Sequence, residues 1–446
     1  MPSVLNLPYD VLREIFIGLS AVDVLQFLSS SRKLYYPLID DDSTWYHFCA
    51  PYGITDTGVF RKRSFRIIYG RLLHRYGPLL GLWCSDYPFR GNIVQFRIVP
   101  DRWLRRGEPV IVGEVWEFTH IDKNAAGQRP HHPKYIEFMQ IGFVPWKKST
   151  LKTANDVQIS WHIRSERNLG FLVHNGMPPP WVRMDGDGRL ATPSFHVIAP
   201  SNMTIASSTR PGQPIGTPDM VSSLPWYDSD RGVPPFSQES PPAIIDRKDT
   251  WYYRRSSLHY VPGVEKPASI AFFPPPYNQE SDVRLPDLHN PTCGYGTGYE
   301  DIVPRYYPVR FPAQAGRDPA SPQWTPDSVV GIWLGDYGPN GTECLFLEHH
   351  AGEGMIRAWK LTGDMNVPRG TCSWAANVQL PLSDTEPKRR AFAGQGTIAQ
   401  HGFARSENIP IRVVFTGRDE LVVSWAFEFD MKCIRYRTTR GRVGDA

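Results

Sequence analysis

The stretch SVVGIWLGDYGPNGTECLFLEHHAGEGMIRAWKLTGDMNVP, residues 328–368, decides the fold class because its side chains alternate in character. In its last apolar run every second residue from Met355 to Leu361 lies on one face, and the residues between them lie on the other. A period of two predicts strands with one buried face. The runs are separated by turns at residues 338–341 and 352–354, where glycine supplies positive φ angles at little steric cost.

The opening of this stretch has an echo 250 residues earlier. Residues 331–337 read GIWLGDY and residues 81–87 read GLWCSDY, so that five of the seven positions are identical or similar. Two units are too few for a solenoid or a propeller. The sequence therefore predicts that both copies belong to one sheet system. Other alternating runs, such as residues 93–99, 110–118 and 411–429, raise the expected total to about ten to twelve strands.

The predicted fold class is α+β, with an N-terminal helical unit followed by a mostly antiparallel β-barrel. A closed barrel is favoured because closure removes exposed strand edges. The Gly-x-Trp starts resemble the strand that opens calycin or lipocalin-like barrels. We expect a helical domain at 1–52, a linker helix at 53–78 and the barrel at 79–440. Residues 200–245, rich in proline and serine, are predicted to be a disordered insertion.

The N-terminal residues have the spacing of helices. Pro8 suits a first helical position, apolar residues recur from Val11 to Leu19, and Ser20 stands three residues before Asp23 in a capping arrangement. Between residues 60 and 76 an apolar stripe predicts another helix. The basic residues on this segment are expected to form a solvated face rather than a phosphate site; they are Arg61, Lys62, Arg63, Arg66, Arg71 and Arg75.

Composition excludes several classes of function. The net charge of +4 is too small to indicate binding to nucleic acid or to a membrane surface. No apolar run approaches the roughly 18 residues of a transmembrane helix. The six cysteines are scattered without a CxxC pair, and we expect no signal peptide, so the thiols are expected to be reduced in the cytoplasm or the nucleus.

Motifs of catalysis are missing as well. The sequence has no nucleophile elbow, P-loop, HExxH or dinucleotide fingerprint, so no catalytic residue and no cofactor are expected. The histidine pairs at 131–132 and 349–350 suggest a metal site, but neighbours on a strand point to opposite faces and we expect none. Trp83 and Trp333 are expected in the core. Asp86 and Asp336 are either a carboxylate pair or, more commonly, turn caps.

The N-terminal pattern resembles an F-box over about 45 residues. The residues that carry the resemblance are Leu7-Pro8-x-Asp10-Val11-Leu12-x-x-Ile15-Phe16-x-x-Leu19-x-x-x-Asp23-Val24-Leu25, with Ser31-Arg32 and Trp45. The resemblance implies docking on the Skp adaptor of cullin–RING ubiquitin ligases. The alternative is an ordinary helical bundle that buries the same side chains. The residues expected to bind the adaptor are Leu7, Pro8, Val11, Leu12, Ile15, Phe16, Leu19, Leu25, Leu28 and Trp45.

The strand region resembles the C-terminal barrel of the F-box only protein 31 family. The residues concerned are Gly331-x-Trp333-x-Gly335-x-Tyr337-Gly338-Pro339-x-Gly341-x-Glu343 and Lys360-x-Thr362-Gly363-Asp364-x-Asn366-Val367-Pro368-x-Gly370. This resemblance implies a substrate receptor of a Skp–cullin–F-box ligase, not an enzyme, whose barrel binds protein degrons, including C-terminal tails. The alternative is a barrel for a small apolar molecule, whose F-box controls its own turnover.

The expected substrate site lies at one end of the barrel, where the 360–368 segment leaves a strand. Its residues are Asp336, Tyr337, Lys360, Asp364 and Asn366. If the Asp364 carboxylate is buried, it would accept N–H groups from an amide-ended tail and repel a free carboxylate. The alternative is that Asp364 caps its own turn.

Overall fold

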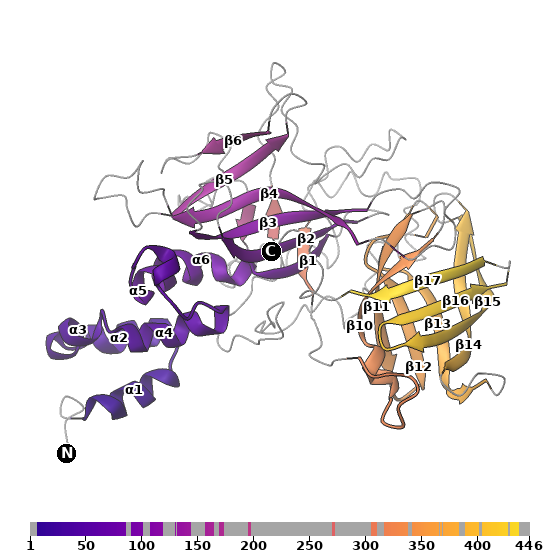
Figure 1. Cartoon of the computed structure of the whole chain (residues 1–446), viewed down its shortest axis with the longest axis horizontal. Coiled ribbons are helices and arrows are strands. Elements are labelled where there is room, and N and C mark those ends of the chain that lie inside the picture. The colour runs from indigo at the N-terminus through magenta and orange to yellow at the C-terminus, as the bar shows by residue number, and fades with distance from the viewer. Residues whose placement is uncertain are drawn as a thin grey trace.

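The computed structural model describes a helical unit, an open sheet and a closed barrel (Figure 1). The residues that it describes are 7–85, 91–100, 108–118, 130, 132–143, 157–164, 169–173, 195–197, 270–272, 305–309, 316–337, 341–364, 366–367, 369–382, 389–400, 404–426 and 429–436. The predicted insertion at 200–245 lies outside these residues, as does Asp86. The α+β class is confirmed.

The helical unit spans residues 7–79. Ser20 caps α2, as predicted, because its hydroxyl accepts the backbone N–H of Asp23 at 3.2 Å. The helix expected over 60–76 is broken into shorter pieces around a π turn, although its apolar stripe is buried. The helices are α1 (Tyr9–Ile17), α2 (Ala21–Ser29), α3 (Arg32–Leu38), α4 (Asp42–Cys49), α5 (Phe65–Ile67) and α6 (His74–Tyr76), with the π turn η4 (Ile68–Leu73) and the 3₁₀ turns η2 (Ala50–Tyr52), η3 (Gly58–Phe60) and η5 (Gly77–Leu79).

The strands that follow the helical unit form a nine-stranded antiparallel sheet in the order β6-β5-β4-β3-β2-β1-β9-β8-β7. These strands are β1 (Gly81–Ser85), β2 (Ile93–Pro100), β3 (Pro109–Glu117), β4 (Lys134–Phe143), β5 (Val157–Arg164), β6 (Leu169–Val173), β7 (Phe195–Val197), β8 (Ile270–Phe272) and β9 (Arg305–Pro308).

The remaining strands close into an eight-stranded barrel, in which β17 returns to pair with β10. Leu421, Val423 and Trp425 of β16 point into it, as their alternation predicted. These strands are β10 (Gly331–Asp336), β11 (Thr342–His350), β12 (Met355–Lys360), β13 (Cys372–Pro381), β14 (Arg390–Gln400), β15 (Ala404–Gly417), β16 (Glu420–Trp425) and β17 (Phe429–Arg435).

The prediction of a single barrel from residue 79 onward is therefore wrong, and the strand count was too low. β1 pairs with β2 and β9, whereas its echo β10 pairs with β11 and β17. The echo describes how each strand begins: the indole N–H of Trp83 donates to the carbonyl of Leu79, and that of Trp333 donates to Val329, at 2.6 and 2.8 Å. A local repeat of this kind fixes a strand start but not the partners of the strand.

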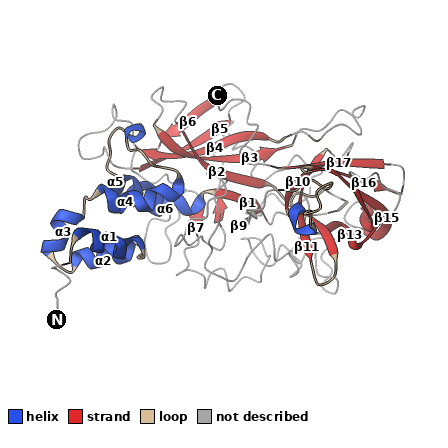
Figure 2. Cartoon of the chain, turned by 60° about the horizontal axis from the view of Figure 1, so that its bottom comes forward, coloured by secondary structure: helices blue, strands red, loops and turns tan. Residues whose placement is uncertain are grey.

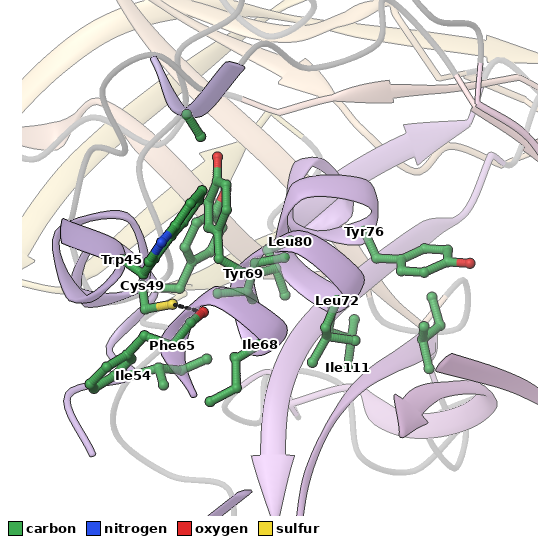
Figure 3. Packing of buried hydrophobic residues seen from close by; sticks show 14 of the residues in the cluster. Trp45, Cys49, Ile54, Phe65, Ile68, Tyr69, Leu72, Tyr76, Leu80 and Ile111 are labelled. Carbon is green, nitrogen blue, oxygen red and sulfur yellow. Dashed lines mark hydrogen bonds between the residues drawn. The ribbon is translucent and has the colours of Figure 1, made fainter. Parts of the chain in front are cut away.

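The part of the sheet formed by β1–β4 is apolar on both faces, and each face has a different neighbour. Trp83 belongs to a core shared with the helical unit, whereas Leu82 and Cys84, on either side of it, belong to a core shared with the outer face of the barrel. Figure 2 shows α4–α6 between α1 and α2 and the sheet, and Figure 1 shows α5 and α6 next to the sheet. Figure 3 shows this core, where Tyr69 and Leu72 lie between Trp45 and Ile111 of the sheet. The barrel has a separate core inside it.

Candidate functional site

Two features of the described residues are candidates for function, and the first is an exposed apolar surface on the helical unit. Val11 and Ile15 are four residues apart on α1, and each is 40% exposed. On the neighbouring helix α2, Val22 and Leu25 are exposed to a similar extent. Aliphatic side chains left open to solvent on two successive helices are candidates for a docking surface. We call Val11 and Ile15 the α1 stripe.

The structure divides the residues that were predicted to bind the adaptor. Leu12, Phe16, Leu28 and Trp45 are buried in the core of the helical unit, and the indole of Trp45 donates to the carbonyl of Ile39 at 2.6 Å. These four are therefore not available on the surface described here. Pro8, Val11, Ile15 and Leu25 are exposed, and Leu7 and Leu19 are half-buried. Helical spacing alone identified both groups as one apolar face, because core and surface stripes adjoin on α1.

The second feature is the barrel, which is closed at the end where β10 begins. Trp324 precedes that strand and lies against Phe392 and Phe415, with ring centroids 6.1 and 5.7 Å away. The guanidinium of Arg390 covers the Trp324 ring at 4.8 Å and donates to the carbonyl of Pro319 at 2.8 Å. Arg435 donates to the carbonyl of Val330 at 3.1 Å. An aromatic plug therefore fills this end.

The opposite end of the barrel contains an ionic cluster, by which we mean Glu343, Lys360 and Asp364. Lys360 points inward on β12, in line with Ile356 and Ala358, and is only 3% exposed. Its ammonium lies 2.7 Å from Glu343 Oε2 and 2.9 Å from Asp364 Oδ2. Burial of a charge is costly unless it is paired, and here one cation has two carboxyl partners.

Aromatic and hydroxyl groups complete the surroundings of Lys360. Its ammonium lies 4.7 Å from the centroid of the Tyr337 ring, within the range of a cation–π contact. The Tyr337 hydroxyl hydrogen-bonds the hydroxyl of Ser373 on β13. The structure thus brings together three of the predicted substrate residues, Tyr337, Lys360 and Asp364.

Asp364 is the cap of its own turn. Its Oδ1 accepts the backbone N–H groups of Asn366 and Val367 at 2.6 and 2.7 Å, while Oδ2 faces Lys360. Asn366 takes part through its main chain in these contacts. Asp336 is the last residue of β10 and is buried on the strand face opposite to Gly335, so it does not lie in the turn where we expected it.

Glu343 and Ser373 were missed as members of the site by sequence reasoning. Glu343 stands at the start of β11 and belongs to the pattern that resembles the family. Its inward direction follows from its position two residues before Leu345, which is in the barrel core. Alternation on β11 could have identified it, whereas nothing in the local sequence around Ser373 predicts its contact with Tyr337.

The pKa values of the two carboxyl groups move in opposite directions. Burial raises the pKa of Glu343 well above 4.5 against the attraction of Lys360, and the neighbouring Asp364 raises it further. Burial opposes ionisation of Asp364 too, but Lys360 and the hydrogen bonds outweigh it and lower the pKa of Asp364 to about 2. We infer an arrangement in which protonated Glu343 donates to ionised Asp364, with Lys360 charged.

This arrangement predicts how stability depends on pH. Glu343 has a raised folded-state pKa, so its contribution is complete below pH 4.5 and is lost as pH rises through that folded pKa. Glutamine stays neutral at every pH, so the Glu343→Gln variant does not lose this contribution. The difference in unfolding free energy between the variant and wild type should therefore shift in favour of the variant by up to about 1.4 kcal/mol per pH unit in that window. Urea unfolding between pH 4.5 and 9 measures this. A constant difference would contradict the protonation of Glu343.

The described residues also bear on metal binding, membrane spans and thiols. No group of three or more histidine, cysteine or acidic side chains there could hold a metal ion. None of the helices in the described ranges is long and apolar enough to cross a membrane. The cysteines of the described part are free thiols. Trp83 and Trp333 are fully buried, which confirms their place in the core.

Comparison with known proteins gives one family match, which covers the barrel, and three similar relatives. Residues 316–436, the barrel with its plug, match the family model described as the cyclin D1 binding domain. The chain is 36% identical over 103 residues to F-box only protein 31 from Rattus norvegicus and from Mus musculus, and 35% identical to that from Homo sapiens. These alignments cover 21% of the chain and 18–19% of the relatives, so the chain matches about a fifth of their length.

Proposed function

We propose that this chain is the substrate-recognition subunit of a Skp–cullin–F-box ubiquitin ligase. Three findings support the proposal: the N-terminal motif that resembles an F-box, the similarity to F-box only protein 31, and the match of the barrel to a cyclin D1 binding domain. The observation that carries it is the exposed α1 stripe, because Val11 and Ile15 offer a partner adjoining aliphatic side chains to bury on one face of α1.

In this proposal the helical unit is the F-box, and its surface holds the Skp adaptor. The adaptor links the chain to the cullin and RING subunits, which would supply the ubiquitin chemistry. The chain itself would be a non-catalytic receptor that needs no cofactor and acts in the cytoplasm or the nucleus. A calycin-like barrel would hold the degron.

We place the degron site at the barrel end with the ionic cluster, because the aromatic plug fills the other end. A site that reads a short tail needs polar groups that match the buried donors and acceptors of the ligand. Lys360 is already paired with ionised Asp364, so a tail carboxylate at the cluster would have to compete with that like charge for the ammonium. A C-terminal tail that ends in a neutral amide fits the cluster better.

The preference for a neutral tail can be titrated directly. Matched peptides that end in an amide or in a free acid should differ in affinity by about a hundredfold, because like charges confined together repel far more strongly than in water. Asp364→Asn should narrow that difference. If Asp364→Asn keeps the fold and the full preference, Asp364 is solely a turn cap, and if wild type binds neither peptide the site lies elsewhere.

The alternative function is a barrel that binds a small apolar molecule, with the helical unit controlling turnover of the protein. The largely apolar interior of the barrel is the observation in its favour. Affinity purification from cells separates the two functions. A receptor should co-purify with Skp adaptor, cullin and ubiquitylated proteins, and these should be lost in Val11→Glu/Ile15→Glu. A small-molecule barrel should instead retain a ligand that mass spectrometry of the denatured protein detects.

A further inference from the structure

The turn at residues 61–63 departs from what its sequence predicts. Three consecutive cations, Arg61, Lys62 and Arg63, were expected to be solvated, yet the Arg63 side chain is only 6% exposed. Arg61 and Lys62 have positive φ angles of 55° and 61°. Left-handed backbone at two successive residues that are not glycine is rare and strained, so the surrounding contacts must hold it.

Those contacts join the helical unit to the sheet. The guanidinium of Arg63 donates to the carboxylate of Glu108, which is buried immediately before β3, and Arg61 Nε lies 3.6 Å from the same carboxylate. Arg63 also covers the ring of Phe143 on β4 at 4.3 Å. Phe60, fully buried, meets that ring edge-on. A buried carboxylate with two cationic partners, one of them stacked on an aromatic ring, is a directional contact and not a general apolar one.

A second joint connects the sheet to the barrel. Tyr436, directly after β17, lies with its ring centroid 4.4 Å from that of Trp116 on β3. Its hydroxyl is 3.4 Å from that of Tyr135 and 3.5 Å from Gln95 Oε1. The same surface buries Leu82 and Cys84 of β1 against Ile332 and Leu334 of β10. The end of the barrel strand is thus held in the sheet by an aromatic anchor.

We propose that the nine-stranded sheet is a rigid spacer that holds the barrel at a fixed angle to the helical unit, and that Glu108 is the positioning residue of its first joint. This inference rests on the proposed function for its consequence. In a ligase, ubiquitin reaches a lysine only when the bound substrate is presented in the right direction, and fixed geometry raises the effective concentration of that lysine. Loosening the joint should slow transfer without weakening either binding event.

The experiment measures the distance between the two ends of the full chain. Spin labels on p-acetylphenylalanine at Tyr36 of α3 and at Leu380 of β13, both at least 70% exposed, avoid the native thiols. Electron–electron double resonance should give one narrow distance distribution for wild type. Glu108→Ala should widen it about twofold or more, since Arg63 and Arg61 lose their shared anion. Glu108→Gln is the milder variant if Glu108→Ala does not fold.

The matched control is Asp40→Ala. It removes the Asp40–Arg66 pair, another arginine–carboxylate contact, which joins two segments of the helical unit at 2.5 Å but lies at the surface. That variant should keep the wild-type distribution. A distribution as wide in wild type as in Glu108→Ala, or unchanged in both Glu108 variants, would overturn the rigid spacer.

The second arm follows ubiquitin transfer in a ligase assembled from the full chain, the Skp adaptor, cullin and RING subunits, with cyclin D1 as probe. Glu108→Ala should lower the initial rate about fivefold or more, with the affinities for adaptor and probe unchanged. A wide distribution with an unchanged rate would overturn the positioning role. A narrow distance distribution in a wild-type chain that binds no adaptor would instead refute the proposed function, while the rigidity of the spacer would still be supported.

Discussion

Lys360→Met is expected to lower the free energy of unfolding by about 3–5 kcal/mol, because it removes the cation that two buried carboxyl groups share. Methionine replaces the methylene chain of lysine, so the lost stability reports on the charge rather than on a cavity. Urea unfolding at pH 7 measures the change. Addition of Asp364→Asn should recover part of it, since the buried charge left without its cation is that of ionised Asp364.

Arg357→Met is the matched control on the same strand. Arg357 lies on the outer face of β12, as does Trp359. Its guanidinium is 2.5 Å from the carboxylate of Glu353, and this pair lies at the surface. Screened pairs of this kind contribute about 0–1 kcal/mol. If Lys360→Met cost no more than Arg357→Met, the ionic cluster would not be the tightly paired, buried feature that we describe.

Val11→Glu/Ile15→Glu is expected to weaken binding of the Skp adaptor by about a hundredfold or more, since it puts charge at the centre of an apolar contact surface. Because both side chains are exposed in the free chain, its melting temperature should stay within about 2 °C of wild type. Biolayer interferometry and calorimetry measure the two quantities.

Two other substitutions on α1 show how that result is to be interpreted. Leu12→Asp places a charge in the buried core and should unfold the helical unit, so a loss of adaptor binding in that variant would carry no information about docking. Arg13→Ala changes an exposed residue on the opposite side of α1 from the stripe and should leave both stability and adaptor affinity as in wild type. Wild-type affinity in Val11→Glu/Ile15→Glu would remove the α1 stripe from the docking surface.

Periodicity predicted those strands in which apolar side chains on one face and polar side chains on the other distinguish the buried face from the exposed one. It gave the inward face of β12 with Ile356 and Ala358, the face of β16 with Val423, and the cap at Ser20. It failed where alternation is ambiguous. On β1, Leu82 and Trp83 are both apolar because the two faces of the sheet cover different neighbours, and no spacing within the strand reveals which neighbours these are.

The candidate site was predicted only where its residues are close in the sequence. Lys360 and Asp364 are four residues apart and Asp364 caps the turn that follows it, so local sequence places them together. Glu343 joins them only through the pairing of β11 with β12. The Arg63–Glu108 contact spans 45 residues and two structural units, and only tertiary packing turns an apparently solvated cation into a buried one.

The most direct test of the proposed receptor is a titration of the purified Skp adaptor into the full chain by isothermal calorimetry. The receptor proposal predicts saturable one-to-one binding with a submicromolar dissociation constant, about −8 kcal/mol or stronger, that disappears in Val11→Glu/Ile15→Glu. No heat of binding from a correctly folded wild-type chain at concentrations far above this range would contradict it.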